Sequence, residues 1–380
     1  MGELPVSIRL NPSKGLAGLQ GQQVPWSVYG RILPSKPVFT LDPLFHAGCY
    51  YVQDSSAMYV GHIFRKILDK IGHNGMRVLD LCAAPGGKTT DLAASLRERY
   101  GDDFLLVSNE VMKERARILS DNVAIWGDPN ILVCSVDPAI LGRLQGYFDV
   151  IVADVPCSGE GMFRKDIKAV ENWSENNVQL CAARQKRILA DVWDCLKEGG
   201  ALVYSTCTYE PCENDDNLFW ASQELGGEII TPEDEFAQYG VRLTPYGNLL
   251  KAGEVPGEGQ WVGSLIKTSP SGTFKGKITD VVKPLRFGTP KGEQKGNKIV
   301  PDPDYALNLN YAKEFPEIHV SRQQALEFLH HDALRFPDAP KGYNAVVFEG
   351  HPLGFVNNLG TRCNIIHPNS RRILMNLPKV

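Results

Sequence analysis

Residues 78–90 read Val-Leu-Asp-Leu-Cys-Ala-Ala-Pro-Gly-Gly-Lys-Thr-Thr, a hydrophobic run that passes into two glycines. This pattern predicts a buried strand, a glycine-rich turn and the start of a helix. Glycine lets the backbone approach a ligand closely, and the first N–H groups of a helix have no partner within it. The stretch therefore predicts a ligand site at the carboxyl end of a strand in an α/β sheet.

The residues around this turn indicate the type of ligand. Gly87-Lys88-Thr89 also fits the end of a nucleotide-binding P-loop, but that motif needs a glycine where this chain has Cys82. The next predicted strand ends at Glu110, where an acidic side chain can bind the hydroxyls of a ribose. The alternative for Glu110 is a solvated charge at a helix start. Together with Asp80 and the glycine turn, Glu110 favours an adenosine-type cofactor.

Strand-like and helix-like patterns alternate over residues 71–268, which predicts an α/β domain with a Rossmann-type, doubly wound sheet. The expected strands are 77–82, 104–109, 131–135, 148–153, 201–205 and 263–267. The expected helices are 89–100, 113–123, 178–196 and 214–225. The glycine turn thus belongs to a sheet whose carboxyl edge carries the ligand site.

Three smaller regions accompany this domain. Residues 1–70 form a small N-terminal α+β segment, with a strand at 4–12 and a helix that we expect to start at Asp54 or Ser55 as N-cap. Residues 269–298 are basic and rich in Gly, Lys and Pro, and we interpret them as a linker or exposed strands. Residues 299–380 predict a small α+β module, with a helix at 321–329 and strands at 343–348, 352–356 and 371–375.

Composition narrows the class of protein. Of the 380 residues, 43% are apolar and 22% are charged, as in ordinary globular domains, and no stretch approaches the ~18 apolar residues of a membrane span. The first twenty residues lack the pattern of a signal peptide, so we expect a cytoplasmic protein. The nine cysteines include no Cys-x-x-Cys pair, which argues against a disulfide framework and against a metal site. Because the net charge is −4, a nucleic acid would have to be held by a local basic face.

Two cysteines follow predicted strands directly. Cys157 lies in Asp-Val-Pro-Cys-Ser-Gly (154–159), and Cys207 lies in Ser-Thr-Cys-Thr-Tyr (205–209). The carboxyl ends of parallel strands meet at one edge of a sheet, so we expect both thiols and Asp154 in the same crevice. Two thiols beside a carboxylate indicate nucleophilic catalysis. We interpret the other cysteines, including Cys212, as small structural residues.

Several of these segments resemble one known family. Residues 80–90, 154–165 and 204–214 look like the motifs of the Nop/Sun family of RNA cytosine-5 methyltransferases, and the similarity extends to residues 5–12 and 53–58. The tail, residues 342–372, resembles the PUA-like end of the bacterial RsmF/YebU subgroup, which modifies small-subunit ribosomal RNA. The resemblance implies a class I methyltransferase domain that binds S-adenosylmethionine. It also implies that the N-terminal segment and the PUA-like C-terminal module bind RNA.

The resemblance implies a mechanism as well. In this family the cysteine of the Thr-Cys motif, here Cys207, adds to carbon 6 of cytosine and makes carbon 5 nucleophilic. The cysteine of the Pro-Cys motif, here Cys157, removes the proton from carbon 5 and so releases the enzyme. Asp154 is expected to hydrogen-bond the base, and Lys88 to orient it or to lower the pKa of a thiol. Such help matters because a free thiol, with a pKa of ~8.5, is only slightly ionised at neutral pH.

The resemblance assigns further residues to ligands. The cofactor is expected to contact Cys82, Ala83, Ala84, Pro85, Gly86, Gly87, Lys88, Glu110, Arg115, Asp137 and Asp154. The alternative for Asp137 is a loop aspartate before Pro138. Candidates for RNA binding are Arg9, Arg164, Lys165 and the basic residues between 275 and 298, with Phe163 stacking near a flipped-out cytosine.

Three alternative functions have to be weighed against the methylation of small-subunit ribosomal RNA. A DNA cytosine methyltransferase also uses a Pro-Cys motif, but as its nucleophile, and the Thr-Cys motif argues against that class. Transfer RNA is the alternative to small-subunit ribosomal RNA as the substrate. A non-catalytic RNA-binding factor for ribosome assembly is the alternative to an enzyme, and intact Cys157, Cys207 and Asp154 argue against it. Nothing in the sequence indicates an obligate dimer, so we expect a monomer.

Overall fold

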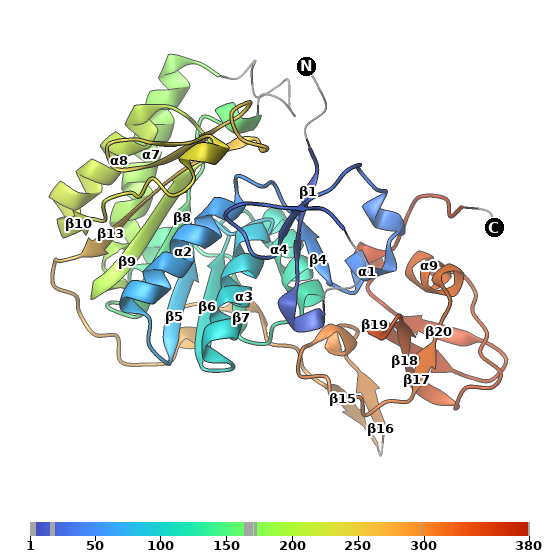
Figure 1. Ribbon diagram of the computed structural model, residues 1–380. Helices are drawn as coiled ribbons and strands as arrows, with labels where there is room; N and C mark the ends of the chain where they lie inside the picture. The colour runs from blue at the N-terminus through green and yellow to red at the C-terminus, as the bar shows by residue number, and fades with distance from the viewer. Residues whose placement is uncertain (1–4, 16–19, 163–169, 171–172, 297, 379–380) are drawn as a thin grey trace.

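A mixed ten-stranded sheet forms the centre of the computed structural model, which describes residues 5–15, 20–162, 170, 173–296 and 298–378. The sheet has the order β11-β12-β13-β9-β8-β5-β6-β7-β14, and β10 pairs with β13. Its parallel strands are β5 (Met76–Asp80), β6 (Phe104–Asn109), β7 (Ile131–Cys134), β8 (Phe148–Asp154) and β9 (Leu196–Thr206). The Rossmann-type fold predicted from the alternating pattern is therefore confirmed (Figure 1).

Helices pack on both faces of this sheet. They are α2 (Met58–Ile71), α3 (Gly87–Tyr100), α4 (Lys113–Trp126), α5 (Pro138–Leu141), α7 (Glu175–Trp193) and α8 (Asp215–Trp220). The antiparallel strands that complete the sheet on the β9 side are β10 (Gly227–Ile229), β11 (Val241–Leu243), β12 (Gly247–Lys251) and β13 (Gly259–Lys267). Of these four, the sequence pattern predicted only β13, because the others are short and partly polar.

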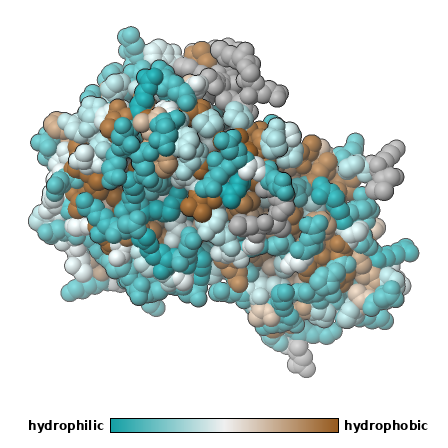
Figure 2. All heavy atoms as spheres, viewed as in Figure 1, coloured by the Kyte–Doolittle hydropathy of each residue, from teal (hydrophilic) through white to brown (hydrophobic). Residues whose placement is uncertain are grey.

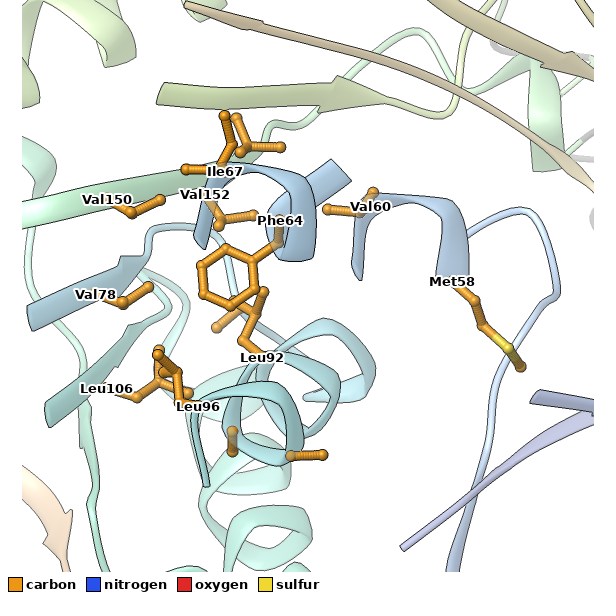
Figure 3. Packing of buried hydrophobic residues seen from close by; sticks show 14 of the residues in the cluster. Met58, Val60, Phe64, Ile67, Val78, Leu92, Leu96, Leu106, Val150 and Val152 are labelled. Carbon is orange, nitrogen blue, oxygen red and sulfur yellow. The ribbon is translucent and has the colours of Figure 1, made fainter. Parts of the chain in front are cut away.

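Two hydrophobic layers cover the two faces of the sheet. Val78 and Val150 point to one layer, while their chain neighbours Leu79 and Ile151 point to the other, as the two-residue period of a strand requires. Figure 3 shows Phe64 of α2 lying between the sheet and α3 in the first layer. Strands buried on both faces read as continuous apolar runs, which is why these strands could be predicted from the sequence.

The start of α2 differs from the prediction. The helix begins at Met58, and neither Asp54 nor Ser55 caps it. The Asp54 carboxylate accepts a hydrogen bond from the Ser56 N–H at 2.9 Å, and the Ser55 hydroxyl donates to the Pro256 carbonyl at 2.5 Å. Asp54 also accepts from the Glu258 N–H at 3.1 Å, so both side chains join the N-terminal segment to the loop before β13. The predicted N-cap is wrong.

Residues 269–298 are more than a linker. Strand β14 (Pro284–Phe287) pairs antiparallel with β7 and becomes the last strand of the central sheet. Strands β15 (Gly292–Lys295) and β16 (Lys298–Pro301) form a separate hairpin. Because β14 satisfies the backbone groups of β7, which would otherwise lie at an open edge, the sheet extends past the predicted boundary at residue 268.

The C-terminal module contains a four-stranded sheet and one helix. The strands are β17 (Glu317–His319), β18 (Gly342–Phe348), β19 (His351–Asn358) and β20 (Cys363–Ile366), and the helix is α9 (Arg322–His330). The predicted strand at 371–375 is wrong, because residues Asn369–Arg371 form a 3-10 helix instead. The Arg371 side chain is largely covered there and pairs with Asp304, so its charge serves tertiary packing.

The N-terminal segment packs between the two larger parts of the molecule (Figure 1). Its strands are β2 (Gln22–Gln23), β3 (Gly30–Ile32), β1 (Ser7–Leu10) and β4 (Tyr50–Val52), in that order across the sheet. Ile8 and Leu44 from this segment share one hydrophobic core with Phe328 and Val346 from the C-terminal module. The two ends of the chain thus form a continuous packed unit, although they are far apart in the sequence.

No helix in the described part of the chain is long and apolar enough to cross a membrane. The face shown in Figure 2 carries hydrophilic and hydrophobic residues intermixed over the central domain and the C-terminal module.

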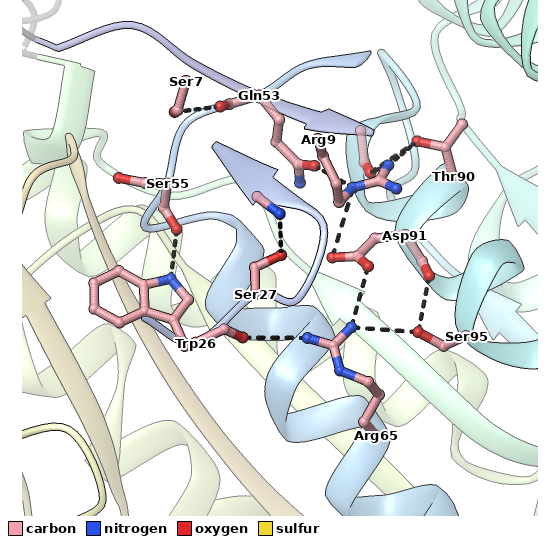
Figure 4. A network of polar contacts seen from close by, with 12 residues as sticks. Ser7, Arg9, Trp26, Ser27, Gln53, Ser55, Arg65, Thr90, Asp91 and Ser95 are labelled. Atoms are coloured by element: carbon pink, nitrogen blue, oxygen red, sulfur yellow. Dashed lines mark hydrogen bonds and ion pairs between the residues drawn. The ribbon is translucent and has the colours of Figure 1, made fainter. Parts of the chain in front are cut away.

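Arg9, a candidate for RNA binding, is instead fully buried between β1 and α3. Its Nε donates to the Gln53 side chain at 2.8 Å, and its Nη2 donates to the Thr90 hydroxyl at 2.5 Å (Figure 4). The Asp91 carboxylate lies 3.8 Å from the Arg9 Nε and supplies the opposite charge. The prediction of an RNA contact is wrong, because Arg9 joins the N-terminal segment to the central domain.

Replacing Arg9 with methionine is expected to lower the free energy of unfolding by about 3 kcal/mol, because it breaks a buried ion pair and leaves Asp91 with less compensation. Urea unfolding followed by circular dichroism measures the change. The partly exposed Arg31→Met variant on the neighbouring strand is the control and should change the free energy by less than about 0.5 kcal/mol. An equal decrease in the free energy of unfolding in the two variants would contradict the role of Arg9 in joining the N-terminal segment to the central domain.

Candidate active site

The glycine turn lies between β5 and α3, as residues 78–90 predict. Gly86 has φ +115°, a left-handed conformation that side chains disfavour, and a Cβ there would lie 3.2 Å from Leu119. Two side chains of α4 hold the turn from behind. Arg115 donates to the Ala84 carbonyl at 2.8 Å, and Asn122 donates to the Pro85 carbonyl at 2.7 Å. The turn is therefore rigidly placed, and Arg115 contributes to its placement.

A cavity of about 360 Å³ opens against this turn. Every residue of 82–88 except Gly86 lines it, together with Asp154 and Cys207 from the ends of two neighbouring strands. Gln53 and Asp54 close it on the side of the N-terminal segment, and Glu258 and Gln260 close it on the side of β13. Its volume suits a small organic ligand. A second cavity of about 370 Å³ lies between α2 and the strands around β13 and contains none of the predicted site residues.

Asp154 ends β8 at the wall of the first cavity. Its Oδ2 lies 2.8 Å from the Lys88 Nζ, and its Oδ1 accepts hydrogen bonds from the Ser205 hydroxyl at 2.7 Å and from the Gln260 amide at 2.9 Å. Burial alone would lower the pKa of Lys88, but the adjacent Asp154 raises it above its ordinary value. The lysine is therefore a cation, and the carboxylate is held in one orientation.

Gln260 was not predicted to belong to the site. It lies in β13, is buried, and also donates to the Thr206 carbonyl at 2.9 Å. A glutamine next to the apolar residues Trp261 and Val262 is the signal in the sequence that could have marked it, because a buried amide needs hydrogen-bond partners.

The two cysteines meet at the same edge of the sheet. Strands β8 and β9 are parallel neighbours, with Asp154 paired to Ser205, so the loops that follow them lie side by side. The Sγ atoms of Cys157 and Cys207 are 2.9 Å apart, and both residues are free thiols that are partly exposed. The contact with Cys207, and then burial, raises the pKa of Cys157 well above its ordinary value. A thiolate at Cys157 is therefore disfavoured while the Cys207 sulfur lies beside it.

Close packing keeps these loops together. The Gly161 N–H donates to the Cys207 carbonyl at 2.7 Å, and a Cβ on Gly161 would lie only 2.8 Å from that oxygen. The Glu160 carboxylate accepts from the Thr208 hydroxyl at 2.9 Å and from the Tyr209 N–H at 2.7 Å. The loop after Cys157 is thereby folded over the loop that contains Cys207.

Four of the predicted cofactor residues do not line the cavity, namely Gly86, Arg115, Glu110 and Asp137. The Glu110 carboxylate is buried, accepts from the Met112 N–H at 2.9 Å and lies 3.3 Å from Arg115. Asp137 caps α5 by accepting from the Ala139 N–H at 3.0 Å, which is the structural alternative that the sequence left open. Their roles in cofactor binding stay predictions.

The predicted RNA-binding residues are only partly tested by the structure. Phe163, Arg164 and Lys165 lie outside the described residues. Within the basic stretch, Arg286 pairs with Asp304 at 2.7 Å, so it holds the C-terminal module to the sheet. Most of its lysines, including Lys295 and Lys298, are exposed. Among the described residues, no group of His, Cys, Asp or Glu is arranged to hold a metal ion.

Asp80 is fully buried beneath the turn and gives a pH dependence that can be measured. Burial raises the pKa of Asp80 to about 7, although the Thr89 hydroxyl donates to its Oδ2 at 2.6 Å. Between about pH 4 and pH 7 the folded protein keeps a proton on Asp80 that the unfolded chain has lost. The free energy of unfolding therefore falls as the pH rises through this range, and the contribution of the protonated Asp80 is lost once the pH has passed about 7. The free energy of unfolding of wild type minus that of Asp80→Asn should therefore be smaller at pH 8 than at pH 5.

Urea unfolding of both proteins at the two pH values measures this difference. The exposed Asp103→Asn variant is the control, and its difference from wild type in the free energy of unfolding should be the same at both pH values. An Asp80→Asn offset that does not change with pH would contradict a buried, protonated Asp80.

Three family models match this chain. They are described as 16S rRNA methyltransferase RsmB/F over residues 68–224, the N-terminal domain of 16S rRNA methyltransferase RsmF over residues 1–55, and the methyltransferase RsmF PUA domain over residues 315–373. They follow one another along the chain in the order expected from the resemblance.

Curated relatives agree with these matches. A ribosomal RNA small subunit methyltransferase F of Salmonella paratyphi A is 36% identical over 208 residues, which are 53% of this chain and 41% of that protein. The same-named protein of Escherichia coli O157:H7 is 36% identical over 179 residues, or 47% of this chain and 36% of its own length. The matched part is thus less than half the length of these relatives.

Solved structures agree in fold. A methyltransferase homolog protein from Pyrococcus horikoshii is 28% identical, with a TM-score of 0.58 over 70% of this chain and 87% of its own. NSun6 from the same organism is 23% identical, with a TM-score of 0.50 over 62% of this chain and 57% of its own, and it supports the fold alone.

Proposed function

We propose that this chain, three parts of which match models of RsmB/F and RsmF methyltransferases, transfers a methyl group from S-adenosylmethionine to carbon 5 of a cytosine in RNA. The observation that carries this proposal is the 2.9 Å contact between the Sγ atoms of Cys157 and Cys207. Cys207 lines the cavity together with the Asp154–Lys88 ion pair, and Cys157 lies directly behind Cys207, outside the lining. Two thiols at one site suit a reaction that needs a nucleophile and a base at the same time.

The residues around the glycine turn fit such a cofactor. Gly87 places its backbone against the cavity, and a Cβ there would lie 3.2 Å from the Tyr51 ring. The Oδ1 of the buried Asp80 has no hydrogen-bond partner, which leaves it available to a polar group at the turn. Residues 82–88 and Asp80 would hold S-adenosylmethionine, which supplies an electrophilic methyl group.

Cys207 is the nucleophile in this proposal. Its Sγ forms a bond to carbon 6 of the cytosine, and the electron pair of the ring double bond moves to carbon 5. Carbon 5 then takes the methyl group and still carries its own proton. Cys207 cannot remove that proton, because its sulfur is bonded to the ring.

Cys157 is the base that completes the reaction. It takes the proton from carbon 5, the ring double bond forms again, and the bond between carbon 6 and the Cys207 sulfur breaks. A raised pKa makes a thiolate at Cys157 a stronger proton acceptor once it is formed. The 2.9 Å separation of the sulfurs places the base beside the sulfur that attacks the ring.

Asp154 and Lys88 hold the base in this proposal. The Asp154 carboxylate faces the cavity and can accept hydrogen bonds from the amino group and the protonated ring nitrogen of the cytosine. A proton on that nitrogen draws electrons from carbon 6 and favours the attack. The Lys88 cation keeps the carboxylate in place, and both groups line the cavity beside Cys207.

The RNA that we propose is small-subunit ribosomal RNA. The curated relatives that match this chain carry that substrate in their names, and the PUA-domain match covers the C-terminal module. The target cytosine must be unpaired or flipped out of a helix, because carbon 5 has to reach the cavity.

Nucleoside analysis tests the reaction. The purified protein is incubated with methyl-labelled S-adenosylmethionine and, separately, with unmodified small-subunit ribosomal RNA, assembled small subunits and transfer RNA. Mass spectrometry of the digested RNA is expected to find the label in 5-methylcytidine from the ribosomal substrates. Label found only in transfer RNA would mean that transfer RNA, and not ribosomal RNA, is the substrate. No label in any RNA would favour a non-catalytic assembly factor.

A further inference from the structure

A buried dipeptide lies behind the two cysteine loops, and the chemistry proposed above does not use it. Glu213 and Asn214 connect the 3-10 helix Pro211–Glu213 to α8, and their exposed fractions are 0% and 1%. A carboxylate and an amide are costly to bury unless they hold specific partners. Their partners include a peptide group next to each of the two cysteines, the Ser158 N–H and the Thr208 carbonyl.

Glu213 and Gln185 hold the loop of Cys157 from both sides. The Glu213 Oε2 accepts from the Ser158 N–H at 3.1 Å and from the Gln185 Nε2 at 2.7 Å. The same Gln185 Nε2 donates to the Pro156 carbonyl at 3.0 Å. The residues before and after Cys157 are thus fixed to one buried pair of side chains, and rotation of the loop around the thiol is restricted.

Asn214 does the same for the loop of Cys207. Its Oδ1 accepts from the Thr206 hydroxyl at 2.5 Å, and its Nδ2 donates to the Thr208 carbonyl at 3.0 Å. The Thr208 and Ser158 hydroxyls, 2.9 Å apart, link the two loops directly. Each of two consecutive residues therefore anchors the flanks of one cysteine.

We infer that Glu213 is the positioning residue for Cys157 and that Asn214 is the positioning residue for Cys207. This inference rests on the proposed function, because it assigns each residue to one step of that reaction. Loss of the Glu213 contacts should slow the removal of the carbon-5 proton after the adduct has formed. Loss of the Asn214 contacts should slow the attack that forms the adduct.

The two steps can be separated in one assay. Glu213→Ala, Asn214→Ala and wild type are incubated with S-adenosylmethionine and the RNA substrate, and the fraction of protein bonded to RNA is read on a denaturing gel. Methyl transfer in a single turnover is measured in parallel. Cys157→Ala on the same gel is the reference for adduct that cannot be released, and circular dichroism confirms that each variant is folded.

The two alanine variants are expected to differ in the fraction of protein that is bonded to RNA. Glu213→Ala should raise the fraction of bonded protein at least about fivefold and lower turnover by roughly 10–100-fold, as displacement of a reacting group does. Asn214→Ala should lower single-turnover methyl transfer by roughly 10–100-fold and give no accumulated adduct. Glu213→Gln should restore release, because an amide oxygen can accept the same hydrogen bonds as the Glu213 Oε2.

A purely structural role would give a different pattern. Both alanine variants would then lose adduct formation and turnover in parallel, and the inference would be overturned. If Glu213→Ala does not fold, Gln185→Leu tests the same anchor of the Cys157 loop and is expected to accumulate adduct. If Cys157→Ala itself forms no adduct while wild type methylates RNA, the proposed roles of the two cysteines fail, and this inference fails with them.

Discussion

Replacing Cys157 with alanine is expected to leave the protein covalently joined to its RNA. Without the second thiol, the proton on carbon 5 stays in place and the bond between carbon 6 and the Cys207 sulfur cannot break. Replacing Cys207 with alanine should instead abolish the adduct and lower methyl transfer on the order of 10⁴-fold or more, as the loss of other enzymatic nucleophiles does. A denaturing gel of each variant after incubation with S-adenosylmethionine and RNA gives the result directly.

Cys212→Ala is the matched control for both variants. Cys212 lies only five positions after Cys207 and is also a free, partly exposed thiol, but its Sγ accepts from the Gln179 side chain at 3.8 Å, whereas the Cys157 Sγ contacts the Cys207 Sγ. It should behave like wild type in the gel and in the transfer assay. An adduct in Cys207→Ala that is absent from Cys157→Ala would make Cys157 the nucleophile and reverse the two assignments.

Asp154→Asn is expected to lower single-turnover methyl transfer by roughly 10²–10³-fold, which is the effect of removing one preorganised charged partner of a reacting group. The amide can still accept from Ser205 and Gln260. It no longer neutralises Lys88, however, and it is a poorer acceptor for a protonated ring nitrogen. Rapid-quench measurement with saturating cofactor and RNA separates this effect from weaker binding.

Lys88→Met tests the partner of that ion pair. Because Asp154 and Lys88 act as a unit, the double variant should lose little more activity than the worse of the single variants. The exposed Asp216→Asn variant, on nearby α8, is the control and should retain wild-type activity. Full activity in Asp154→Asn would exclude a role for this carboxylate in holding the base.

The sequence by itself determined the parts of the protein that depend on short-range patterns. A buried parallel strand is a continuous apolar run, so β5, β6, β7 and β8 could be predicted closely. The glycine turn at residues 81–86 depends on local backbone conformation, and its residues stand next to one another in the chain. Cys157 and Cys207 could be placed together because parallel strands end at the same edge of a sheet.

Only the tertiary structure decided which polar residues support that site and which serve packing. Arg9 and Arg286 read as exposed charges, yet each pairs with a carboxylate distant from it in the chain. Gln260 and Glu213 belong to the site through partners 106 and 55 positions away, and no local pattern marks such a pair. Burial and hydrogen bonding of a polar side chain depend on the elements that pack around it, so they follow from the fold and not from the neighbouring sequence.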